Sequence, residues 1–175
     1  QDMLFSKIQI PYLITKDIDT ISQILNRHDC KLIIIRRNLL HSYISHKKAE
    51  HFDKWSKVDT TSTKLKINLQ NFLDYYNKTT KAYISIINLI KHKNVLFLEY
   101  EQIHKLQTER EKIDYILDKV KLIGLELEFD KPDGYEFLFK QDKNKKISDK
   151  ILNYHDLKAF LIKKNLGYLL VDEHS

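Results

Sequence analysis

The stretch Lys31–Ser45, with the sequence KLIIIRRNLLHSYIS, gives the strongest indication of how this chain folds. Its first part, Lys31–Ile35, is a short apolar run rich in β-branched residues, which is typical of a strand buried on both faces of a parallel sheet. Arg36 and Arg37 follow immediately, and Asn38 opens a segment with the pattern of a helix. The stretch therefore predicts a buried strand whose carboxyl end brings fixed positive charge to the start of a helix.

The composition of the chain limits the folds that it can adopt. It has 175 residues, of which 42% are apolar, with only 3 Gly and 2 Pro. This is enough apolar material for one domain, residues 1–175, with a core of its own. The scarcity of turn residues argues against a sandwich of many short strands and favours helices with short connections.

The charge and the cysteine content narrow the classes of partner and of site. The net charge of +6 suits an anionic partner such as nucleic acid, a nucleotide or an acidic glycan, and it equally suits a solvated lysine-rich surface. Cys30 is the only cysteine, which excludes a disulfide or a cysteine-based zinc site within one chain. No apolar run approaches the roughly 20 residues that span a bilayer, and the first residues lack the pattern of a signal peptide. We therefore expect a cytoplasmic location.

The other predicted elements complete the order of an α/β domain. They are a strand at Leu4–Ile10, a helix at Lys16–Asp29, a long helix at Ile67–His92 capped by Asn68, a strand at Asn94–Tyr100, a helix from a Thr108–Glu111 capping box to Gly124, and terminal helices within Ser148–Lys164 with Asn153 as a cap. Strands that alternate with helices predict a mostly parallel sheet, and ligands of such sheets lie at the carboxyl ends of the strands.

Phosphate binding is the chemistry that this strand end favours. The first turn of a helix offers N–H groups and a partial positive charge, and the guanidinium of Arg37 adds a fork of donors that matches phosphate. Ser45 lies eight positions after Arg37, just over two helical turns along, so we expect its hydroxyl and the guanidinium to grip one phosphate. Arg36 is expected to point to the other side of the strand end and to pair structurally, although the two arginines could exchange roles.

The pattern of Arg37, Asn38 and Ser45 after a hydrophobic strand resembles the segment of the sulfotransferases that binds the 3′-phosphate of 3′-phosphoadenosine 5′-phosphosulfate. The sequence RRNLLHSYIS is especially similar to bacterial and phage members that act on carbohydrates or lipopolysaccharide. The sequence VLFLEYEQI resembles the family strand that ends in Tyr-Glu-Asp-Leu, which implies that Tyr100 lies near the adenine. Gln102 stands where the family has Asp.

Two further segments carry the resemblance. The sequence FKQDKNKKISDKILNYHDLKAFL is similar to the C-terminal segment of the bacterial group, and the matching residues are Lys140, Gln141, Asn153 and Tyr154. The sequence KIQIP resembles a Lys-x-His-x-Pro stretch near the reacting sulfate. Lys7 and Pro11 agree with it, whereas Gln9 stands where many members have the catalytic His. No Gly precedes Gly124, so the Gly-rich phosphate loop that begins the family fold does not occur in this sequence.

The resemblance implies a P-loop-NTPase-like sulfotransferase fold that is incomplete at its N-terminus. It also implies transfer of a sulfuryl group from the nucleotide donor to a hydroxyl of a carbohydrate or similar acceptor, without a metal. The implied nucleotide ligands are Arg37, Asn38, Ser45, Arg36, Tyr100 and Lys140. Lys7 and Gln9 take the catalytic positions, where Lys7 would neutralise charge near the bridging oxygen. Gln9 cannot act as a base, and the candidate bases by residue type are Glu50, His46 and His51.

Two other functions stay open at this point. A nucleotide-binding remnant without transfer activity would keep Arg37 and Ser45, and it is favoured by the lack of the Gly-rich loop and by Gln9. A basic nucleic-acid-binding domain is the less favoured alternative, because the aromatic residues sit at core spacing and no helix-turn-helix or zinc-finger pattern occurs. We therefore expect a nucleotide and a glycan as partners and no nucleic acid, and the sequence does not predict the oligomeric state.

Overall fold

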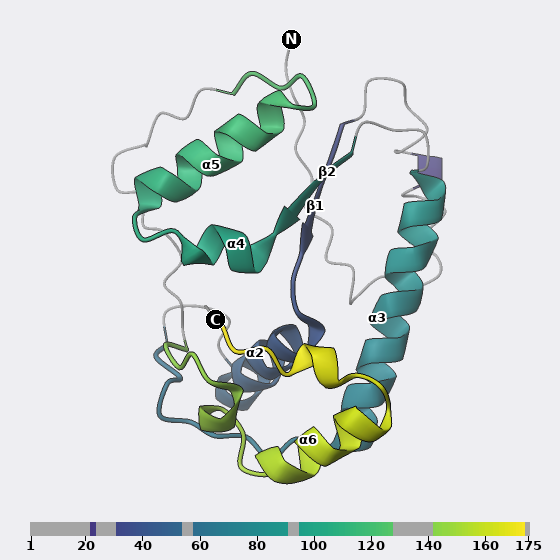
Figure 1. Ribbon diagram of the computed structural model, residues 1–175, viewed down its shortest axis with the longest axis vertical. Coiled ribbons are helices and arrows are strands. Elements are labelled where there is room, and N and C mark those ends of the chain that lie inside the picture. Colours follow the sequence, from purple (N-terminus) through teal and green to yellow (C-terminus); the bar gives the residue numbers. More distant parts are fainter. Residues whose placement is uncertain (1–21, 24–30, 54–57, 91–94, 128–141, 174–175) are drawn as a thin grey trace.

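Two short parallel strands lie between one long helix on one side and two shorter helices on the other, and the remaining helices lie below them (Figure 1). The computed structural model describes residues 22–23, 31–53, 58–90, 95–127 and 142–173. In chain order its elements are β1 (Leu32–Arg36), α2 (Leu39–Phe52), α3 (Leu69–Leu89), β2 (Val95–Glu99), α4 (Tyr100–Lys105), α5 (Glu109–Lys121), the 3₁₀ turn η2 (Ile147–Asp149), α6 (Tyr154–Lys163) and the 3₁₀ turn η3 (Gly167–Leu169). The predicted α/β class, with helices around a parallel sheet, is confirmed, and the described sheet has two strands.

The register of the two strands fixes which side chains share a face. Leu32 pairs with Val95, and the pairing continues to Arg36 and Glu99. Partners in a parallel ladder point to the same side, and successive residues alternate. One face packs on α3, through a cluster of Ile34, Ile86 and Ile90. The other face packs on α4 and α5, through a cluster of Leu96, Leu98, Ile103, Val120 and Ile123 (Figure 1).

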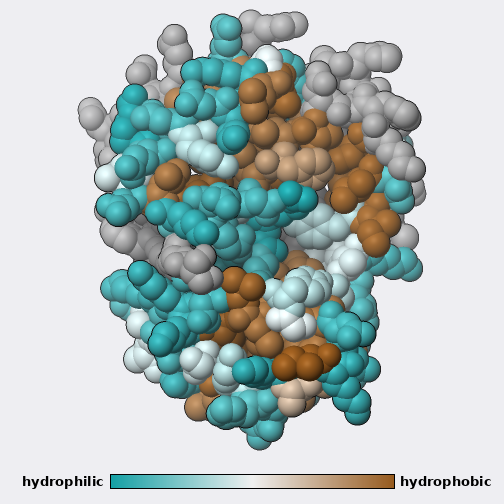
Figure 2. Space-filling model, in the orientation of Figure 1, coloured by the Kyte–Doolittle hydropathy of each residue, from teal (hydrophilic) through white to brown (hydrophobic). Residues whose placement is uncertain are grey.

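The expectation of a strand buried on both faces is wrong for β1. Only Ile34 is fully buried, whereas Ile33 is 37% exposed and Ile35 is 52% exposed. The reason is that the buried cluster made with α4 and α5 contains residues of β2 and none of β1. Figure 2 shows apolar residues at the surface over the strands and the upper part of α3.

A second body of the core lies below the sheet in Figure 1, where α2, the first half of α3 and α6 meet. Its most buried residues are Leu40, Ile44, Phe72, Ile147, Ile151, Leu157 and Leu161. The segment before α3 joins the C-terminal part of the chain here by a parallel bridge between Leu65 and Ile151. This bridge brings residues 142–173 against α2 and thereby against the end of β1.

Most of the predicted helix ends are confirmed. The side chains of Asn38, Asn68 and Thr108 each accept a hydrogen bond from the first turn of the helix that follows, and Thr108 forms the capping box with Glu111. Asn153 occupies the cap position of α6 but makes no capping bond. Its side-chain amide instead accepts from the N–H of Ile67 at 2.8 Å and donates to the Ile67 carbonyl at 2.9 Å, and so extends the bridge to the 65–67 segment.

The long helix predicted at Ile67–His92 is present as α3, Leu69–Leu89, and residues 91–92 lie outside the described ranges. It buries Phe72, Thr79 and Ile86, whereas Ile87 is 42% exposed. Gly124, the predicted stop after α5, has a φ of 67°. In the described ranges, none of the helices is both long and apolar enough to cross a membrane.

Several predictions lie outside the described residues. They concern the strand at Leu4–Ile10, nearly all of the helix at Lys16–Asp29, and the predicted site residues Lys7, Gln9 and Lys140.

Candidate functional site

The two arginines at the end of β1 point to opposite faces of the sheet. Arg36 forms an ion pair with Glu99, its ladder partner, and its guanidinium carbon lies 4.9 Å from the ring centre of Phe97. These contacts are on the α3 face. The structural pairing expected for Arg36 is therefore present, and Arg37 is left to the other face, where Tyr100 begins α4.

Arg37 and Ser45, which the sequence predicts to share a phosphate, lie next to each other, and the shared phosphate stays a prediction. The Nη2 group of Arg37 donates a hydrogen bond of 3.0 Å to the Ser45 hydroxyl. The guanidinium carbon also lies 4.3 Å from the ring centre of Tyr100, a distance at which a cation is attracted to an aromatic face. The structure thus brings together three of the predicted site residues at the carboxyl end of a parallel strand.

One donor of this arginine lacks an acceptor. The Nε atom of Arg37 is buried and has no hydrogen-bond partner, although the side chain as a whole is 25% exposed. A buried donor without a partner costs about 1–3 kcal/mol. Such an atom next to a hydroxyl and an aromatic ring is what a site for an oxyanion would contain.

Asn38 has a structural role at this place. Its side-chain oxygen accepts from the N–H groups of Leu40 and His41, and its amide donates to the Leu169 carbonyl at 3.0 Å. Its own N–H donates to Glu101 at 2.8 Å. Two N–H groups of the first turn of α2 are therefore already paired, so this site depends on Arg37 more than the sequence alone indicates.

Beneath Arg37 lies a buried group of charges that the sequence does not reveal. One carboxylate oxygen of Glu173, Oε1, lies 3.0 Å from Lys150 Nζ, 3.2 Å from His41 Nδ1 and 4.0 Å from Arg37 Nη2. The side chains of His41, Lys150 and Glu173 are 2%, 3% and 8% exposed. We call Arg37, His41, Lys150 and Glu173 the anion cluster. Its members come from distant parts of the described chain, and no local pattern marks His41, Lys150 or Glu173 as neighbours of Arg37.

The geometry of His41 indicates which nitrogen carries a proton. Its Nε2 lies 2.8 Å from the Val171 carbonyl, and because a carbonyl only accepts, Nε2 must be the donor. The other nitrogen, Nδ1, faces the carboxylate of Glu173. This nitrogen lies 3.2 Å from Glu173 Oε1 but makes no hydrogen bond, so the bond to Val171 is what orients the ring.

The buried Lys48 and the largely buried Asp142 continue the network away from the strand end. Lys48 Nζ donates to Asp142 at 2.7 Å and to the Thr60 carbonyl at 2.8 Å. Asp142 also lies 4.0 Å from Lys150, which links this pair to the anion cluster. The C-terminal segment is thus attached to α2 by charge as well as by apolar packing.

Tyr100 is suited to contact a ligand without ionising. Burial raises the pKa of its hydroxyl above the ordinary value, and the nearby positive charge of Arg37 opposes this without reversing it. The phenol is therefore neutral at physiological pH and can donate a hydrogen bond, while its ring supports the guanidinium.

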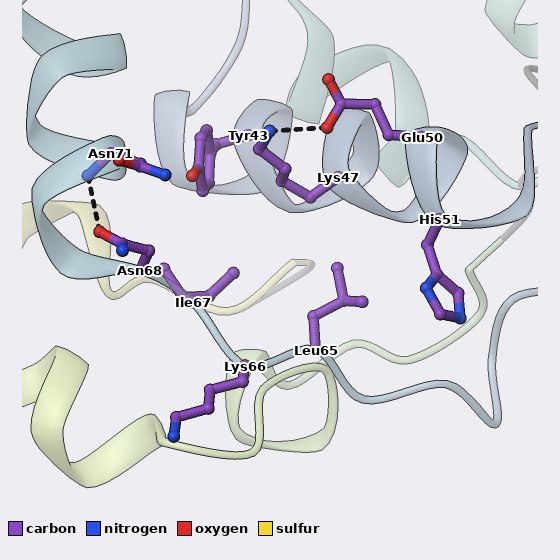
Figure 3. A pocket seen from close by; sticks show the side chains of 9 residues that line it. All are labelled: Tyr43, Lys47, Glu50, His51, Leu65, Lys66, Ile67, Asn68 and Asn71. Carbon is purple, nitrogen blue, oxygen red and sulfur yellow. Dashed lines mark hydrogen bonds and ion pairs between the residues drawn. The ribbon is translucent and has the colours of Figure 1, made fainter.

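Two of the three candidate bases, Glu50 and His51, line a pocket of about 420 Å³ between α2 and the segment that leads into α3, away from Arg37 (Figure 3). Tyr43, Lys47, Glu50 and His51 line it from α2, whereas Leu65 and Ile67 point toward α2 from the opposite wall. Helical spacing puts this lining on the side of α2 opposite to Ser45. Neither Ser45 nor Arg37 or Tyr100 lines the pocket.

Glu50 is a poor base in this setting. Its carboxylate accepts a hydrogen bond of 2.6 Å from Lys47 and lies 2.8 Å from His46 Nε2. The hydrogen bond from Lys47 lowers the pKa of Glu50 below its ordinary value. The structure thus joins the candidates Glu50 and His46 to each other and does not join them to Arg37.

Within the described ranges, no three His, Cys, Asp or Glu side chains lie together as the ligands of a metal ion would. Comparison of the chain with protein-family models, with curated proteins and with solved structures finds no match. The physical features of the strand end, and not kinship, are therefore the basis for inferring what this chain does.

Proposed function

We propose that this chain is a sulfotransferase or the C-terminal part of one, and that Arg37 binds the 3′-phosphate of 3′-phosphoadenosine 5′-phosphosulfate. The observation that carries the proposal is the buried, unpartnered Nε of Arg37 beside the Ser45 hydroxyl. Arg37 follows a strand of a parallel sheet, at the edge where α/β proteins bind their ligands. The implied sulfotransferase fold is part of this proposal.

A phosphate group matches the donors that are available. A guanidinium presents several N–H groups in one plane and pairs with two phosphate oxygens at once. Ser45 is within hydrogen-bonding distance of the same guanidinium and supplies a further donor. Tyr100 lies against the other side of Arg37, so a purine base near the phosphate would have an aromatic neighbour.

In the proposed reaction, the donor supplies the sulfuryl group, which passes to a hydroxyl oxygen of a carbohydrate or similar acceptor. The bond from sulfur to the bridging oxygen breaks, adenosine 3′,5′-bisphosphate leaves, and the hydroxyl proton passes to a base. Arg37 and Ser45 would anchor and orient the nucleotide, which is where positioning contributes to the rate. Lys7 would neutralise charge on the leaving oxygen.

A nucleotide-binding domain without transfer activity is the second candidate. Gln9 stands at the position where the resemblance implies a catalytic His, and an amide cannot accept the proton of the acceptor hydroxyl. Glu50 and His46 contact each other along α2, and neither is joined to Arg37. This candidate predicts the same nucleotide affinity and no sulfuryl transfer.

Calorimetric titration with adenosine 3′,5′-bisphosphate tests the site that both candidates share. We expect saturable binding by the parent chain and at least a tenfold loss of affinity in Arg37→Ala. Arg110→Ala is the matched control, because Arg110 is an exposed arginine of α5 that pairs with Asp114. Absence of binding by the parent, or equal binding by Arg37→Ala, would refute the proposed site. Transfer of labelled sulfate to glycan acceptors then separates the enzyme from the inactive domain.

A further inference from the structure

Glu173 places a negative charge where the donors of the site converge. Its Oε1 atom lies within 4.0 Å of Arg37 Nη2, His41 Nδ1 and Lys150 Nζ. These three groups are cationic or able to become so, and they are the kind of donor that a phosphate oxygen would use. An anion is therefore already present beside Arg37, and it belongs to the chain itself.

We propose that Glu173 is an internal counter-anion of the Arg37 site, which competes with an external phosphate for Arg37 and thereby limits the affinity of the site. For a nucleotide ligand, this inference rests on the proposed function. The competition itself requires only that Arg37 binds an anion. Glu173 acts in this view as a residue that determines affinity and charge preference, and it takes no part in a chemical step.

The electrostatic argument is simple. A carboxylate 4.0 Å from Arg37 satisfies part of the attraction that the guanidinium would otherwise exert on a ligand, and it repels the ligand's own negative charge. Burial strengthens both effects, because Glu173 is only 7% exposed and water screens it poorly. Removing this charge should therefore strengthen the binding of an anion at Arg37.

The carboxylate can be neutralised without detaching the segment that carries it. The backbone N–H of Glu173 donates to the Lys145 carbonyl at 3.0 Å, and the Val171 carbonyl accepts from His41. Asp172 accepts the N–H of Ile147 at 2.8 Å. When Glu173 is neutralised, Lys150 still has the carboxylate of Asp142 at 4.0 Å as a counter-charge. A glutamine at position 173 has the same shape and still offers Lys150 an oxygen.

The test compares the parent chain with Glu173→Gln and with Asp118→Asn. Asp118 is an exposed carboxylate of α5, so its variant controls for the loss of one negative charge elsewhere. Calorimetry gives the affinity for adenosine 3′,5′-bisphosphate, and thermal shift with inorganic phosphate, against chloride at equal ionic strength, reports anion binding without a nucleotide. Circular dichroism checks the fold of each variant. If Glu173→Gln does not fold, Glu173→Asp is measured instead. The shorter aspartate keeps a negative charge near Lys150 but places that charge farther from Arg37.

The expected result is binding that is threefold to tenfold tighter in Glu173→Gln and unchanged in Asp118→Asn. Equal or weaker binding by Glu173→Gln would overturn the inference and make Glu173 a residue that supports the position of Arg37. If no chain binds the nucleotide but phosphate stabilises Glu173→Gln more than the parent, the inference holds and the nucleotide proposal fails. If neither probe acts on any chain, both fail.

Discussion

Lys48 Nζ lies 2.7 Å from a carboxylate oxygen of Asp142, although the two residues are 94 positions apart. Lys48 is 1% exposed, so its charge has been removed almost entirely from water. A buried ammonium is tolerated only where a counter-charge and hydrogen-bond acceptors surround it. The pair therefore fixes the segment that begins at Asp142 on α2, and this is the segment that carries Lys150 and Glu173 to the strand end.

Replacing Asp142 should destabilise the fold more than replacing Lys48. We expect Asp142→Asn to lower the free energy of unfolding by about 3–5 kcal/mol, because it leaves Lys48 charged with only the Thr60 carbonyl for a strong acceptor. Lys48→Met should cost less, since Asp142 keeps Lys150 at 4.0 Å and the N–H of Asn144.

Urea titration followed by circular dichroism measures both costs. Lys143→Met is the matched control, because Lys143 pairs with Asp59 at the surface and exposed pairs contribute about 1 kcal/mol or less. The prediction is wrong if the buried and exposed variants lose equal stability.

Conservative changes at the strand end should separate the roles of Arg37 and Ser45 in ligand binding. Arg37→Lys keeps the charge but removes the fork of donors, and we expect about a tenfold weaker affinity for adenosine 3′,5′-bisphosphate. Ser45→Ala removes one hydroxyl and should weaken the affinity for the same nucleotide by about threefold to tenfold, in keeping with the net free energy of one hydrogen bond.

The double variant Arg37→Lys, Ser45→Ala should lose less than the sum of the single changes, because the two side chains bond to each other. Ser42→Ala is the control on the same helix, since the Ser42 hydroxyl bonds to Tyr75 and not to Arg37. Weaker binding by Ser42→Ala would show a general effect on α2 instead of a local one.

Asp59 should make stability depend on pH in acid. The Thr61 hydroxyl, followed by Lys143, holds the pKa of Asp59 well below its ordinary value in the folded chain. Because the folded-state pKa is depressed, the carboxylate stabilises the fold above the unfolded pKa of about 4, and this contribution is lost as the pH falls from about 5 to about 2. The difference in Tm between the parent and Asp59→Asn should be constant from about pH 6 to 8 and shrink below about pH 4.

Thr61→Val provides the companion measurement for Asp59. It removes the hydroxyl that contributes most to the lowered pKa of Asp59 in the folded chain. The acid limb of its Tm profile should therefore begin near the same unfolded-state pKa as in the parent, but it should be smaller and end at higher pH. Superimposable acid limbs for the parent, Asp59→Asn and Thr61→Val would contradict the assignment.

The turn after α5 should depend on the lack of a side chain at position 124. Gly124 has a φ of 67°, and a Cβ atom there would lie 3.2 Å from Lys31 Nζ. We expect Gly124→Ala to lower the free energy of unfolding by about 1–2 kcal/mol, the cost of the left-handed conformation for an L-residue. Gly167→Ala, where a Cβ atom would meet Ile162 at an ordinary 3.6 Å, should be neutral or slightly stabilising. Equal losses in chemical denaturation would rule out this explanation.

The local features of this fold were determined by the sequence itself. Asn38, Asn68 and Thr108 bond to N–H groups within three residues, so that a short stretch of sequence contains both partners. The alternation of a strand likewise predicts that consecutive arginines point to opposite faces. Arg36 and Arg37 follow this rule. The distance of eight positions from Arg37 to Ser45 predicts that both reach one phosphate, and the structure shows that the two side chains are close enough to bond to each other.

The burial of β1 could not be predicted in this way. An apolar run shows that a strand prefers to leave water, but the helices that cover it come from other parts of the chain. The described helices α4 and α5 bury Leu96 and Leu98 of β2, and Ile35 of β1 remains half exposed. Asn153 is a similar case, because its position predicts a cap and only the nearness of the 65–67 segment gives its amide a better pair of partners.

Only the tertiary structure decided which charges lie around Arg37. His41 contacts Val171 across 130 positions, and Glu173 and Lys150 approach the strand end only because Lys48, Asp142 and the Leu65–Ile151 bridge draw the C-terminal segment onto α2. Sequence periodicity reports the neighbours of a residue along one element, over a few residues. An ion pair between distant segments leaves no such period in the sequence. The sequence therefore determined that Arg37 stands at the end of a strand, and only the tertiary structure determined that Glu173 lies beside it.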